Sequence, residues 1–563
     1  MFKKKNKAYQ LLPMAPTPTP SVSSSNDNQV LANYKTNENI EQHSVEEDLE
    51  SRNDGKIKEV DEKYADLTLK LIQDYGDKVQ PLTPEQEKKL VHKIYFSVVL
   101  IGFLVNFTLF LDKNAMGYAT LLGLFQDAHL TQESFNNLQT LFYVGYLISQ
   151  VPSHILFQKI RLSRYITIVT FTWSFLSLIQ LTAHNFSGLA IIRFLLGFSE
   201  AGVTAAIQHT LAMFLKPDEH QIVSQIWWIS CLAAGIPGGL IAYAVQFVVG
   251  VAPWKVYWAI IGAFTFALSL ACFFFYPDNP ATYKVFTIEE RVHIINRVKA
   301  ATRSSIEQKT VKKYQIKESL RDPVSWLFGL HVFLLMFANN MTFQSAIIYK
   351  DLGFSNLSST LVSIASACWS AVLAIAGGTL LFFFRNQAAH VGTLFCMVAL
   401  LGGILAISLP WERKIGLLAA IFLSNGTGIC YTAALTWSQG SAAGYTKKLS
   451  RTIIWFLAYS VINLIAPQFW RSKDKPRYYP AWGLMIAGAW VSSPIVLQII
   501  RYILVKRNKE RLIWLKQVED GLIEDTIGYV DEVDENGNLV RREVDISMLD
   551  LTDLENKRFI YPL

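Results

Sequence analysis

Residues 193–202 read RFLLGFSEAG and place two opposite charges inside one apolar run, residues 187–214. The run is as long as a membrane-spanning helix needs to be. Arg193, Gly197 and Glu200 are spaced four and then three residues apart, so a helix carries them on one face. A charge at the middle of a bilayer costs at least about 3 kcal/mol. We therefore expect this face to point into the protein or into a water-filled cavity, where ionisable residues serve function.

The same spacing also fits a simpler structure, in which Arg193 and Glu200 belong to an ion pair between helices that only fixes their packing. In our reading of the span boundaries, no other apolar run has a full charge in its middle. This helix is therefore the first candidate for a functional site.

The composition is that of a membrane protein. Of the 563 residues, 51% are hydrophobic and only 17% are charged, against roughly 25% charged in an average soluble protein. The net charge of +7 comes from basic residues between apolar runs, which membrane topology explains better than nucleic-acid binding. No phosphate-binding glycine loop, catalytic constellation or metal-ligand spacing stands out, so we expect neither an enzyme nor a cofactor.

Twelve apolar runs are long enough to cross a bilayer, and none shows the alternation of a strand. They cover residues 94–112, 136–157, 165–183, 187–214, 222–249, 256–275, 324–348, 359–383, 389–409, 415–438, 452–470 and 481–504. We predict an all-α polytopic membrane protein of twelve transmembrane helices in two six-helix halves, residues 91–276 and 324–505. A central loop, 277–323, joins the halves, and two tails, 1–90 and 506–563, flank them.

The tails carry few structural signals. Residues 1–90 are rich in polar residues and proline near the start, which is typical of disorder, with a short amphipathic helix predicted over 60–74. Thr83 followed by Pro84 is typical of a helix start. The alternating residues 528–544 turn at an Asn-Gly pair, which predicts a β-hairpin. We expect this tail to pack on the cytoplasmic face.

The distribution of basic residues predicts the orientation. With both tails in the cytoplasm, the inner loops hold eighteen lysines and arginines and the outer loops nine, as the positive-inside rule requires. The outer loop Arg471–Arg477 is the exception, and its four basic residues could instead meet an anionic substrate.

Other polar residues inside the runs are candidates for a binding site. Asp112 and Lys113 end the first run, where a charge pair at a helix end is an equally good interpretation. Polar side chains, mostly amides, concentrate in the first, fourth, seventh, tenth and eleventh runs. Amides in helix bundles often only hydrogen-bond across helices, at about 0.6 kcal/mol each. Those that we select as candidate ligands are Asn339, Asn340, Gln344 and Asn463.

Several motifs resemble one transporter family. They are Asp112-Lys113 with Gly117-Tyr118-Ala119, FYVGY at 142–146 with Pro152-Ser153, residues 193–200, Trp437, AGYTKK at 443–448, Asn463, Pro467-Gln468 and Pro476-Arg477-Tyr478. Together they resemble the anion:cation symporter group of the major facilitator transporters, and within it the fungal allantoate permeases. The resemblance spans residues 60–563. It implies a monomeric carrier, in the plasma membrane or in the endoplasmic reticulum, that takes up cysteine or a related small carboxylate with protons.

The residues are compatible with this implied function. A zwitterion needs a cation for its carboxylate and an anion for its ammonium, and Arg193 with Asp112 or Glu200 supplies both. Lys113, Asn339, Asn340, Gln344 and Asn463 complete the predicted binding set, and Glu200, with Asp112 as second choice, is the predicted proton-coupling residue. The alternatives are a carrier of another organic anion or vitamin (allantoate, nicotinate, pantothenate or a sulfonate), a nutrient sensor that has lost transport, and a drug-exporting antiporter. The partners expected are a small molecule, protons and the bilayer, with no nucleic acid.

Overall fold

The structure, a computed structural model, describes residues 82–302, 312–384, 386–523, 528–533, 539–544 and 551–563, together with residues 71, 75 and 79. The chain divides into two units, Met1–Asp66 and Leu67–Leu563. The first unit lies outside the described residues, and so does nearly all of the helix predicted over 60–74. The following description concerns the second unit.

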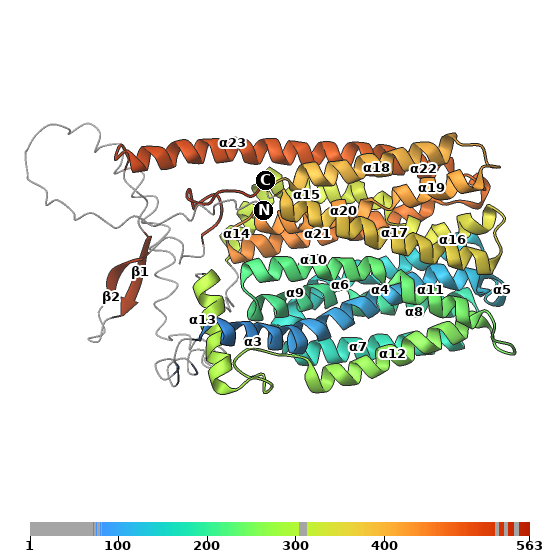
Figure 1. The fold of residues 1–563 in the computed structure, drawn as a ribbon, viewed down its shortest axis with the longest axis horizontal. Helices are drawn as coiled ribbons and strands as arrows, with labels where there is room; N and C mark the ends of the chain where they lie inside the picture. Colours follow the sequence, from blue (N-terminus) through green and yellow to red (C-terminus); the bar gives the residue numbers. More distant parts are fainter. Residues whose placement is uncertain are drawn as a thin grey trace, which may run out of the picture. The chain divides into compact units, whose positions relative to one another are not determined.

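The first six predicted spans are helices that run side by side (Figure 1). In chain order they are α3 Pro84–Ile94 continuing through the π-helical stretch Tyr95–Val99 into α4 Leu100–Leu121, α6 Gln132–Lys159, α7 Leu162–Ile179, α8 Phe186–Glu200 followed by α9 Val203–Phe214, α10 Pro217–Ala233 followed by α11 Gly235–Val245, and α12 Pro253–Phe275. The short helix α5 Leu124–Asp127 follows α4. We refer to α3–α12 as the N-terminal helices.

The last six spans, the C-terminal helices, follow two connecting helices, α13 Ile288–Thr302 and α14 Lys313–Arg321. They are α15 Pro323–Leu335 followed by α16 Met341–Asp351, α17 Asn356–Phe383, α18 Ala388–Ser408, α19 Lys414–Ser424 followed by α20 Thr427–Gly440, α21 Tyr445–Ile465, and α22 Tyr479–Leu484 continuing through the π-helical stretch Met485–Ser492 into α23 Ser493–Glu519. Short 3-10 turns lie at Gln180–Thr182, Met336–Ala338, Ala466–Phe469 and Ser472–Asp474.

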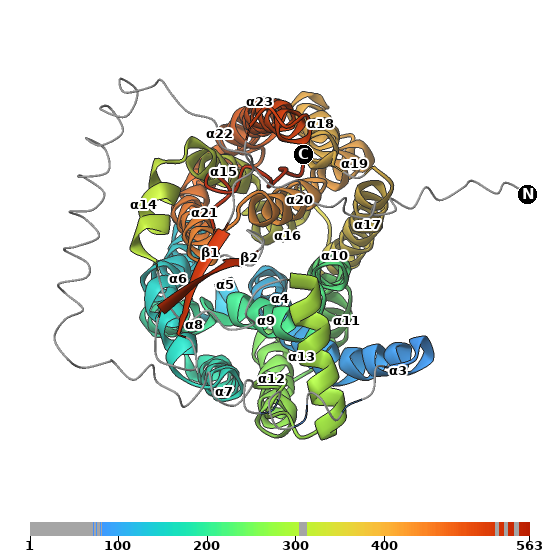
Figure 2. The same ribbon diagram turned by 90° about the vertical axis from the view of Figure 1, so that its left-hand side faces the viewer.

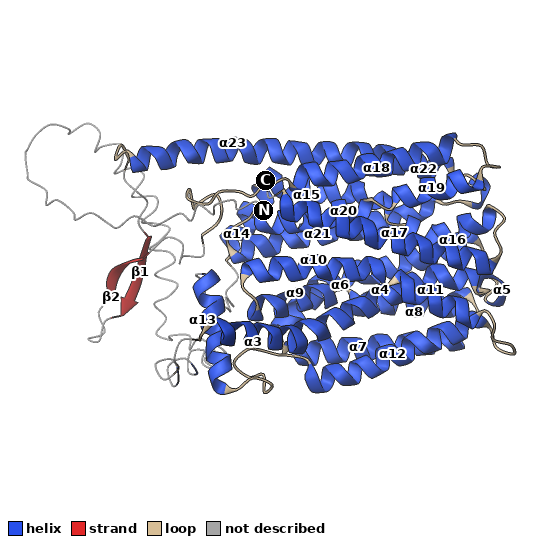
Figure 3. Ribbon diagram, viewed as in Figure 1, coloured by secondary structure: helices blue, strands red, loops and turns tan. Residues whose placement is uncertain are grey.

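All twelve predicted runs are therefore helical. Within the described residues, ten helical segments are long and apolar enough to cross a membrane. The other two runs correspond to α6 and to α10 with α11, and α6 packs closely along α8 in the same bundle. In the part of the chain that is described, strands occur only in a hairpin after α23 (Figure 3). The predicted all-α membrane architecture is confirmed.

The bundle has two ends. The connecting helices α13 and α14 lie at one end, which we call the α13 end, and α5 lies at the other, the α5 end (Figure 1). Viewed from the α13 end, the N-terminal helices gather on one side and the C-terminal helices on the other (Figure 2).

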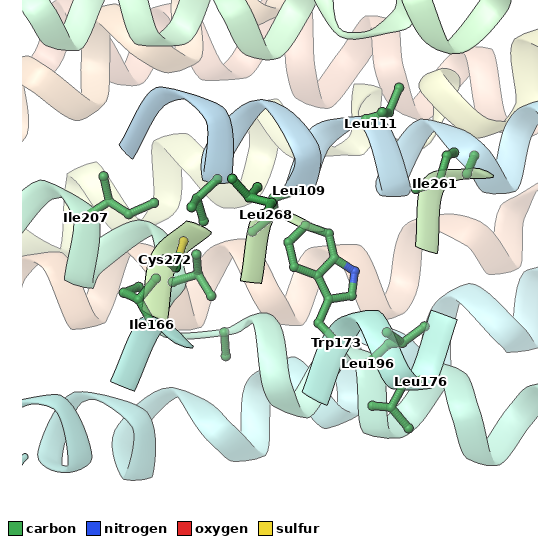
Figure 4. Packing of buried hydrophobic residues seen from close by; sticks show 14 of the residues in the cluster. Leu109, Leu111, Ile166, Trp173, Leu176, Leu196, Ile207, Ile261, Leu268 and Cys272 are labelled. Atoms are coloured by element: carbon green, nitrogen blue, oxygen red, sulfur yellow. The ribbon is translucent and has the colours of Figure 1, made fainter. Parts of the chain in front are cut away.

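Apolar side chains build separate cores within these two sets. One cluster is drawn almost entirely from residues 90–294. Figure 4 shows part of it, with Trp173 of α7 among leucine and isoleucine side chains of α4, α8 and α12. Three others are built from residues 324–561.

Two predictions from local sequence are confirmed. Thr83 caps α3 and forms a capping box with Gln86, so that both side chains satisfy free backbone N–H groups. In the C-terminal tail, β1 Gly528–Val533 pairs antiparallel with β2 Leu539–Val544. The predicted Asn-Gly turn between these strands lies outside the described residues.

Two helix boundaries differ from the prediction. Helix α4 does not end near Asp112 but continues to Leu121, so Asp112 and Lys113 lie well inside it. Helix α21 begins at Tyr445, so Lys447 and Arg451 are buried helical residues and not loop charges. The expectation that α8 alone carries charges within its span is therefore wrong. Charged residues resemble a helix end in a sequence, but they can lie inside a helix when the protein buries them.

Candidate functional site

The charged face of α8 is buried, as predicted. Asn185 caps the helix by accepting a hydrogen bond from the Gly188 N–H at 2.9 Å. Two turns further, Arg193 is 5% exposed and Glu200 1% exposed. Between them Gly197 lies against the backbone of Phe142 in α6, where any side chain would clash.

These two charges do not form the packing ion pair that was the alternative interpretation. Among the described residues, neither carboxylate oxygen of Glu200 has a hydrogen-bond partner, and the same holds for Nε and Nη2 of Arg193. The guanidinium carbon of Arg193 lies 5.3 Å from the centre of the Trp258 ring, a cation–π contact that leaves its N–H groups available. A buried charge without a partner is costly unless a ligand or water forms hydrogen bonds with it.

Helix α4 brings a second pair of charges to the same place. Asp112 is 1% exposed, and its Oδ1 accepts a long hydrogen bond of 3.5 Å from the Ser177 hydroxyl. The Lys113 ammonium lies 5.3 Å from the Phe110 ring and 5.6 Å from the Tyr146 ring. Two helices that are distant in the sequence thus contribute one cation and one anion each.

Three of these four charged residues, Asp112, Arg193 and Glu200, are buried. No ion pair within 4.0 Å forms among these four described residues. Arg193 and Glu200 lie on the same face of α8, as predicted, and Lys113 of α4 adds a second cation to the site.

A cavity of about 20 Å³ adjoins both cations. Its lining residues are Lys113, Met116, Leu138, Gln139, Phe142, Tyr143, Arg193 and Phe343. This volume is about enough for one water molecule. A molecule as large as an amino acid requires the surrounding helices to move apart.

Amide and tyrosine side chains join the two sets of helices beside this cavity. Asn339 donates to Asn463 Oδ1 at 2.6 Å and to the Tyr143 hydroxyl at 3.3 Å. The hydroxyls of Tyr143 and Tyr459 are 3.4 Å apart. Asn340 is buried, and its Nδ2 has no partner among the described residues. Two of the predicted amides, Asn339 and Asn463, therefore lie next to Tyr143 and Tyr459. Through these two tyrosines the N-terminal helices contact the C-terminal helices.

The fourth predicted amide, Gln344, belongs to a different group. Its Nε2 donates to Asn136 and its Oε1 accepts from Gln132, both at 3.0 Å. Asn136 also donates to the Trp470 backbone oxygen at 2.7 Å. Nearer the α5 end, Glu133 accepts two hydrogen bonds from Ser472. This layer of hydrogen bonds joins the N-terminal and C-terminal helices and closes the α5 end.

The loop Arg471–Arg477 has partners within the protein. Lys475 lies 4.0 Å from Asp351, and Arg477 lies over the rings of Trp411 and Tyr479. Lys475 and Arg477, two of the four basic residues considered for binding an anionic substrate, therefore have partners within the protein.

Sequence reasoning missed the aromatic part of the site. Tyr143 and Tyr146 of α6 pack against Tyr459 of α21 with ring centres 6.0 and 6.2 Å apart. Tyrosines are common in apolar helices, so their residue type gave no signal. The only hint was that residues 142–146 belong to one of the motifs that resemble the facilitators.

Comparison with known proteins identifies the family. The model of the Major Facilitator Superfamily matches residues 102–467. The chain belongs to the Major Facilitator Superfamily. It is therefore an integral membrane protein of a transporter family, and its site is a candidate site for a small-molecule substrate.

Three fungal relatives match most of this transporter. The high affinity cysteine transporter of Saccharomyces cerevisiae is 38% identical over 518 residues, which cover 90% of this chain and 96% of the relative. An uncharacterized transporter of Schizosaccharomyces pombe is 43% identical over 90% of this chain and 89% of its own length. The allantoate permease of S. cerevisiae is 24% identical over 90% of this chain and 92% of its own length. A crystal structure of a D-xylose-proton symporter, 11% identical, matches 70% of this chain and 96% of its own with a TM-score of 0.55 and shares the fold.

Proposed function

We propose that this transporter takes up cysteine, or a closely related small amino acid or carboxylate, together with protons. The observation that carries the proposal is the set of four charges on α4 and α8, of both signs. Asp112, Arg193 and Glu200 are buried, and each has side-chain polar atoms without a hydrogen-bond partner among the described residues. A zwitterion can satisfy both signs at once, whereas a simple carboxylate needs only a cation. The similarity to a cysteine transporter supports the same substrate class.

We assign the substrate carboxylate to Arg193, with Lys113 as the second cation at the cavity. Arginine remains charged at any physiological pH, and its planar fork matches two carboxylate oxygens. Asp112 or Glu200 can accept the substrate ammonium. Asn339, Asn340 and Asn463 lie where α16 and α21 approach the N-terminal helices, and they can bind the polar end of the substrate when the cavity widens. Gln344 serves the hydrogen-bonded layer at the α5 end.

Uptake of radiolabelled cysteine into cells that express the protein tests this proposal. We expect uptake to rise as the external pH falls, and unlabelled cysteine to compete better than sulfonates, nicotinate, pantothenate, biotin or allantoate. If allantoate or a vitamin competes more strongly than cysteine, that compound and not cysteine is the substrate. No flux of any of these compounds by a correctly sorted protein would favour a sensor.

An Arg193→Lys variant tests the site within the same assay. Lysine keeps the charge but loses the fork, so we expect affinity to fall by one charge-assisted hydrogen bond, about 1.5–3 kcal/mol, or about 10- to 150-fold in Kd. The control is Arg413→Lys, which makes the same change at an exposed loop position. Equal affinities of the two variants would show that Arg193 does not bind the substrate carboxylate.

We also propose that the α13 end faces the cytoplasm, with both tails and the loop 277–323 on that side and the two six-helix halves moving as units. The positive-inside rule supports this orientation, because the loops at the α13 end carry most of the basic residues. The α5 end, closed by the Gln344 layer, then faces outward. We expect a tag on either tail to be accessible only from the cytoplasmic side. Labelling of residues 277–323 on intact cells would reverse the assignment.

A further inference from the structure

The last residues of the chain, 551–563, dock at the α13 end of the C-terminal helices (Figure 2, label C). We call them the terminal segment. Its backbone is held at several points. Trp437 of α20 donates to the Pro562 oxygen at 2.7 Å, and the Ala388 N–H of α18 donates to the Leu563 oxygen at 3.2 Å. Asn508 of α23 exchanges two hydrogen bonds of 2.9 Å with the backbone of Tyr561.

The surface beneath the terminal segment is a cluster of cations, which we call the basic crevice. It consists of Lys447 and Arg451 from α21 and Arg507 and Arg511 from α23. Lys447 is fully buried and Arg451 is 1% exposed. Cations so deeply buried require carboxylates nearby, because the cost of removing them from water is otherwise not offset.

Two of those carboxylates come from the region of α14. Asp322 binds Arg451 at 3.0 Å and Arg507 at 2.9 Å, and Glu318 binds Lys447 at 2.6 Å. Burial disfavours the ionised form of Asp322, but the hydrogen bond from Arg507 and the surrounding cations hold its pKa below the usual range. Four cations thus face two carboxylates from the transporter body.

The terminal segment supplies the third carboxylate and an aromatic ring. Asp553, which is fully buried, binds the Lys447 ammonium at 2.9 Å and accepts a hydrogen bond of 2.9 Å from the Tyr561 hydroxyl. The Tyr561 ring lies 4.2 Å from the guanidinium carbon of Arg511. An acidic residue and a tyrosine eight residues apart therefore match the charge and the cation–π surface of the crevice.

The helices gripped by the segment also carry the candidate site. Trp437 lies in α20 with Tyr431, and Lys447 lies in α21 with Tyr459 and Asn463. The rings of Tyr431 and Tyr459 are in contact, with centres 5.9 Å apart. Docking therefore fixes the ends of two helices whose middles adjoin the candidate site, through Tyr431, Tyr459 and Tyr143.

We propose that the basic crevice is a docking site for an acidic peptide that carries an aromatic residue eight positions after its acidic residue. The terminal segment occupies this site in cis, and its occupancy sets the turnover of the central site. Release of the segment leaves Lys447 and its neighbours short of negative charge. The ends of α20 and α21 then lose a common anchor, and the geometry of Tyr459 and Asn463 changes with them.

An Asp553→Asn variant tests docking directly. Asparagine keeps the size and one hydrogen-bond acceptor but removes the charge that pairs with Lys447. Trypsin added to the cytoplasmic side of membrane vesicles cuts at the exposed Lys557 and Arg558 when the segment is released, and mass spectrometry measures the freed peptide 559–563. We expect at least about tenfold faster release than from the unaltered protein, which corresponds to a loss of about 1.4 kcal/mol. Release at the original rate would show that Asp553 does not hold the segment.

Glu555→Gln is the matched control, since Glu555 lies in the same segment but is exposed and only caps Thr552. We expect it to leave both peptide release and transport unchanged. In Asp553→Asn, the turnover of radiolabelled cysteine exchange should change together with peptide release. Faster release with unaltered exchange would overturn the link to the central site. The exchange measurement rests on the proposed substrate, whereas the measurement of peptide release does not. A wrong substrate can therefore be told apart from a wrong docking site.

Addition of a synthetic 551–563 peptide separates release of the segment from misfolding. Supplied to the cytoplasmic side of vesicles that contain Asp553→Asn, this peptide should restore exchange, because it refills the crevice. The same peptide with asparagine at position 553 should not. Equal effects of the two peptides, or no effect of either, would contradict a charge-specific docking site.

Discussion

A Glu200→Gln carrier should exchange substrate across the membrane but fail to concentrate it. Glutamine has the shape of a protonated glutamate, so the variant is held in the state that we assign to the substrate-bound carrier. In the unaltered protein, we expect a nearby cation, Arg193 on the same face of α8 or Lys113 of α4, to favour the ionised carboxylate of Glu200 while the site is empty. A substrate carboxylate bound to these cations weakens the attraction, and a proton then binds to Glu200. This sequence links one proton to one substrate molecule.

The expected effect is large. One proton that crosses a gradient of one pH unit provides about 1.4 kcal/mol, which is enough for about tenfold accumulation, and a membrane potential of 100 mV adds about 2.3 kcal/mol if net charge moves. Glu200→Gln should lose this accumulation and its dependence on pH. Exchange of radiolabelled cysteine for unlabelled cysteine should continue, because exchange requires no net proton movement.

The control is Glu412→Gln, which makes the same change in an exposed loop between α18 and α19. It should accumulate substrate normally. If Glu200→Gln still concentrates substrate with the original pH dependence, the coupling group lies elsewhere. Asp112→Asn is then the next variant to measure, because Asp112 is the other buried carboxylate of the candidate site.

A Gly197→Ala substitution should prevent α6 and α8 from packing. A Cβ atom at position 197 would overlap the backbone oxygen of Phe142, and one at Gly145 would overlap that of Phe194. Neither obstacle is a side chain that can rotate away, so the helices themselves must separate. Close helix pairs in membranes depend on such small residues, because dispersion contacts rather than the hydrophobic effect hold them together. We expect destabilisation at or above the upper end of overpacking, about 3 kcal/mol.

Thermal unfolding of the purified protein in detergent measures this effect. Gly378→Ala in α17 is the matched control, since a Cβ there meets no heavy atom within 4 Å and alanine favours a helix. We expect a lower melting temperature and loss of transport for Gly197→Ala, because Arg193 and Glu200 lie on either side of position 197. A melting temperature equal to that of Gly378→Ala would contradict the close contact between α6 and α8.

Local sequence was sufficient for several features. The twelve helical runs followed from apolar length, because a bilayer requires about 20 apolar residues per helix. The buried face of α8 followed from the helical period, which places positions 193, 197 and 200 together. The cap at Thr83 and the hairpin over 528–544 depend on neighbouring residues in the same way. Each of these properties involves interactions between residues a few positions apart.

The partners of the charges were decided only by tertiary structure. Three features join distant parts of the chain. Lys113 of α4 and Arg193 of α8 meet at one cavity, Tyr143 contacts Tyr459 across 316 residues, and Asp553 docks against Lys447. Helical periodicity shows which face of a helix is buried, but not which other helix it meets. The position of Asp112 and Lys113 inside α4 was missed for the same reason. A charge inside a span is tolerated only when other helices surround it, and the sequence of the span itself does not contain those helices.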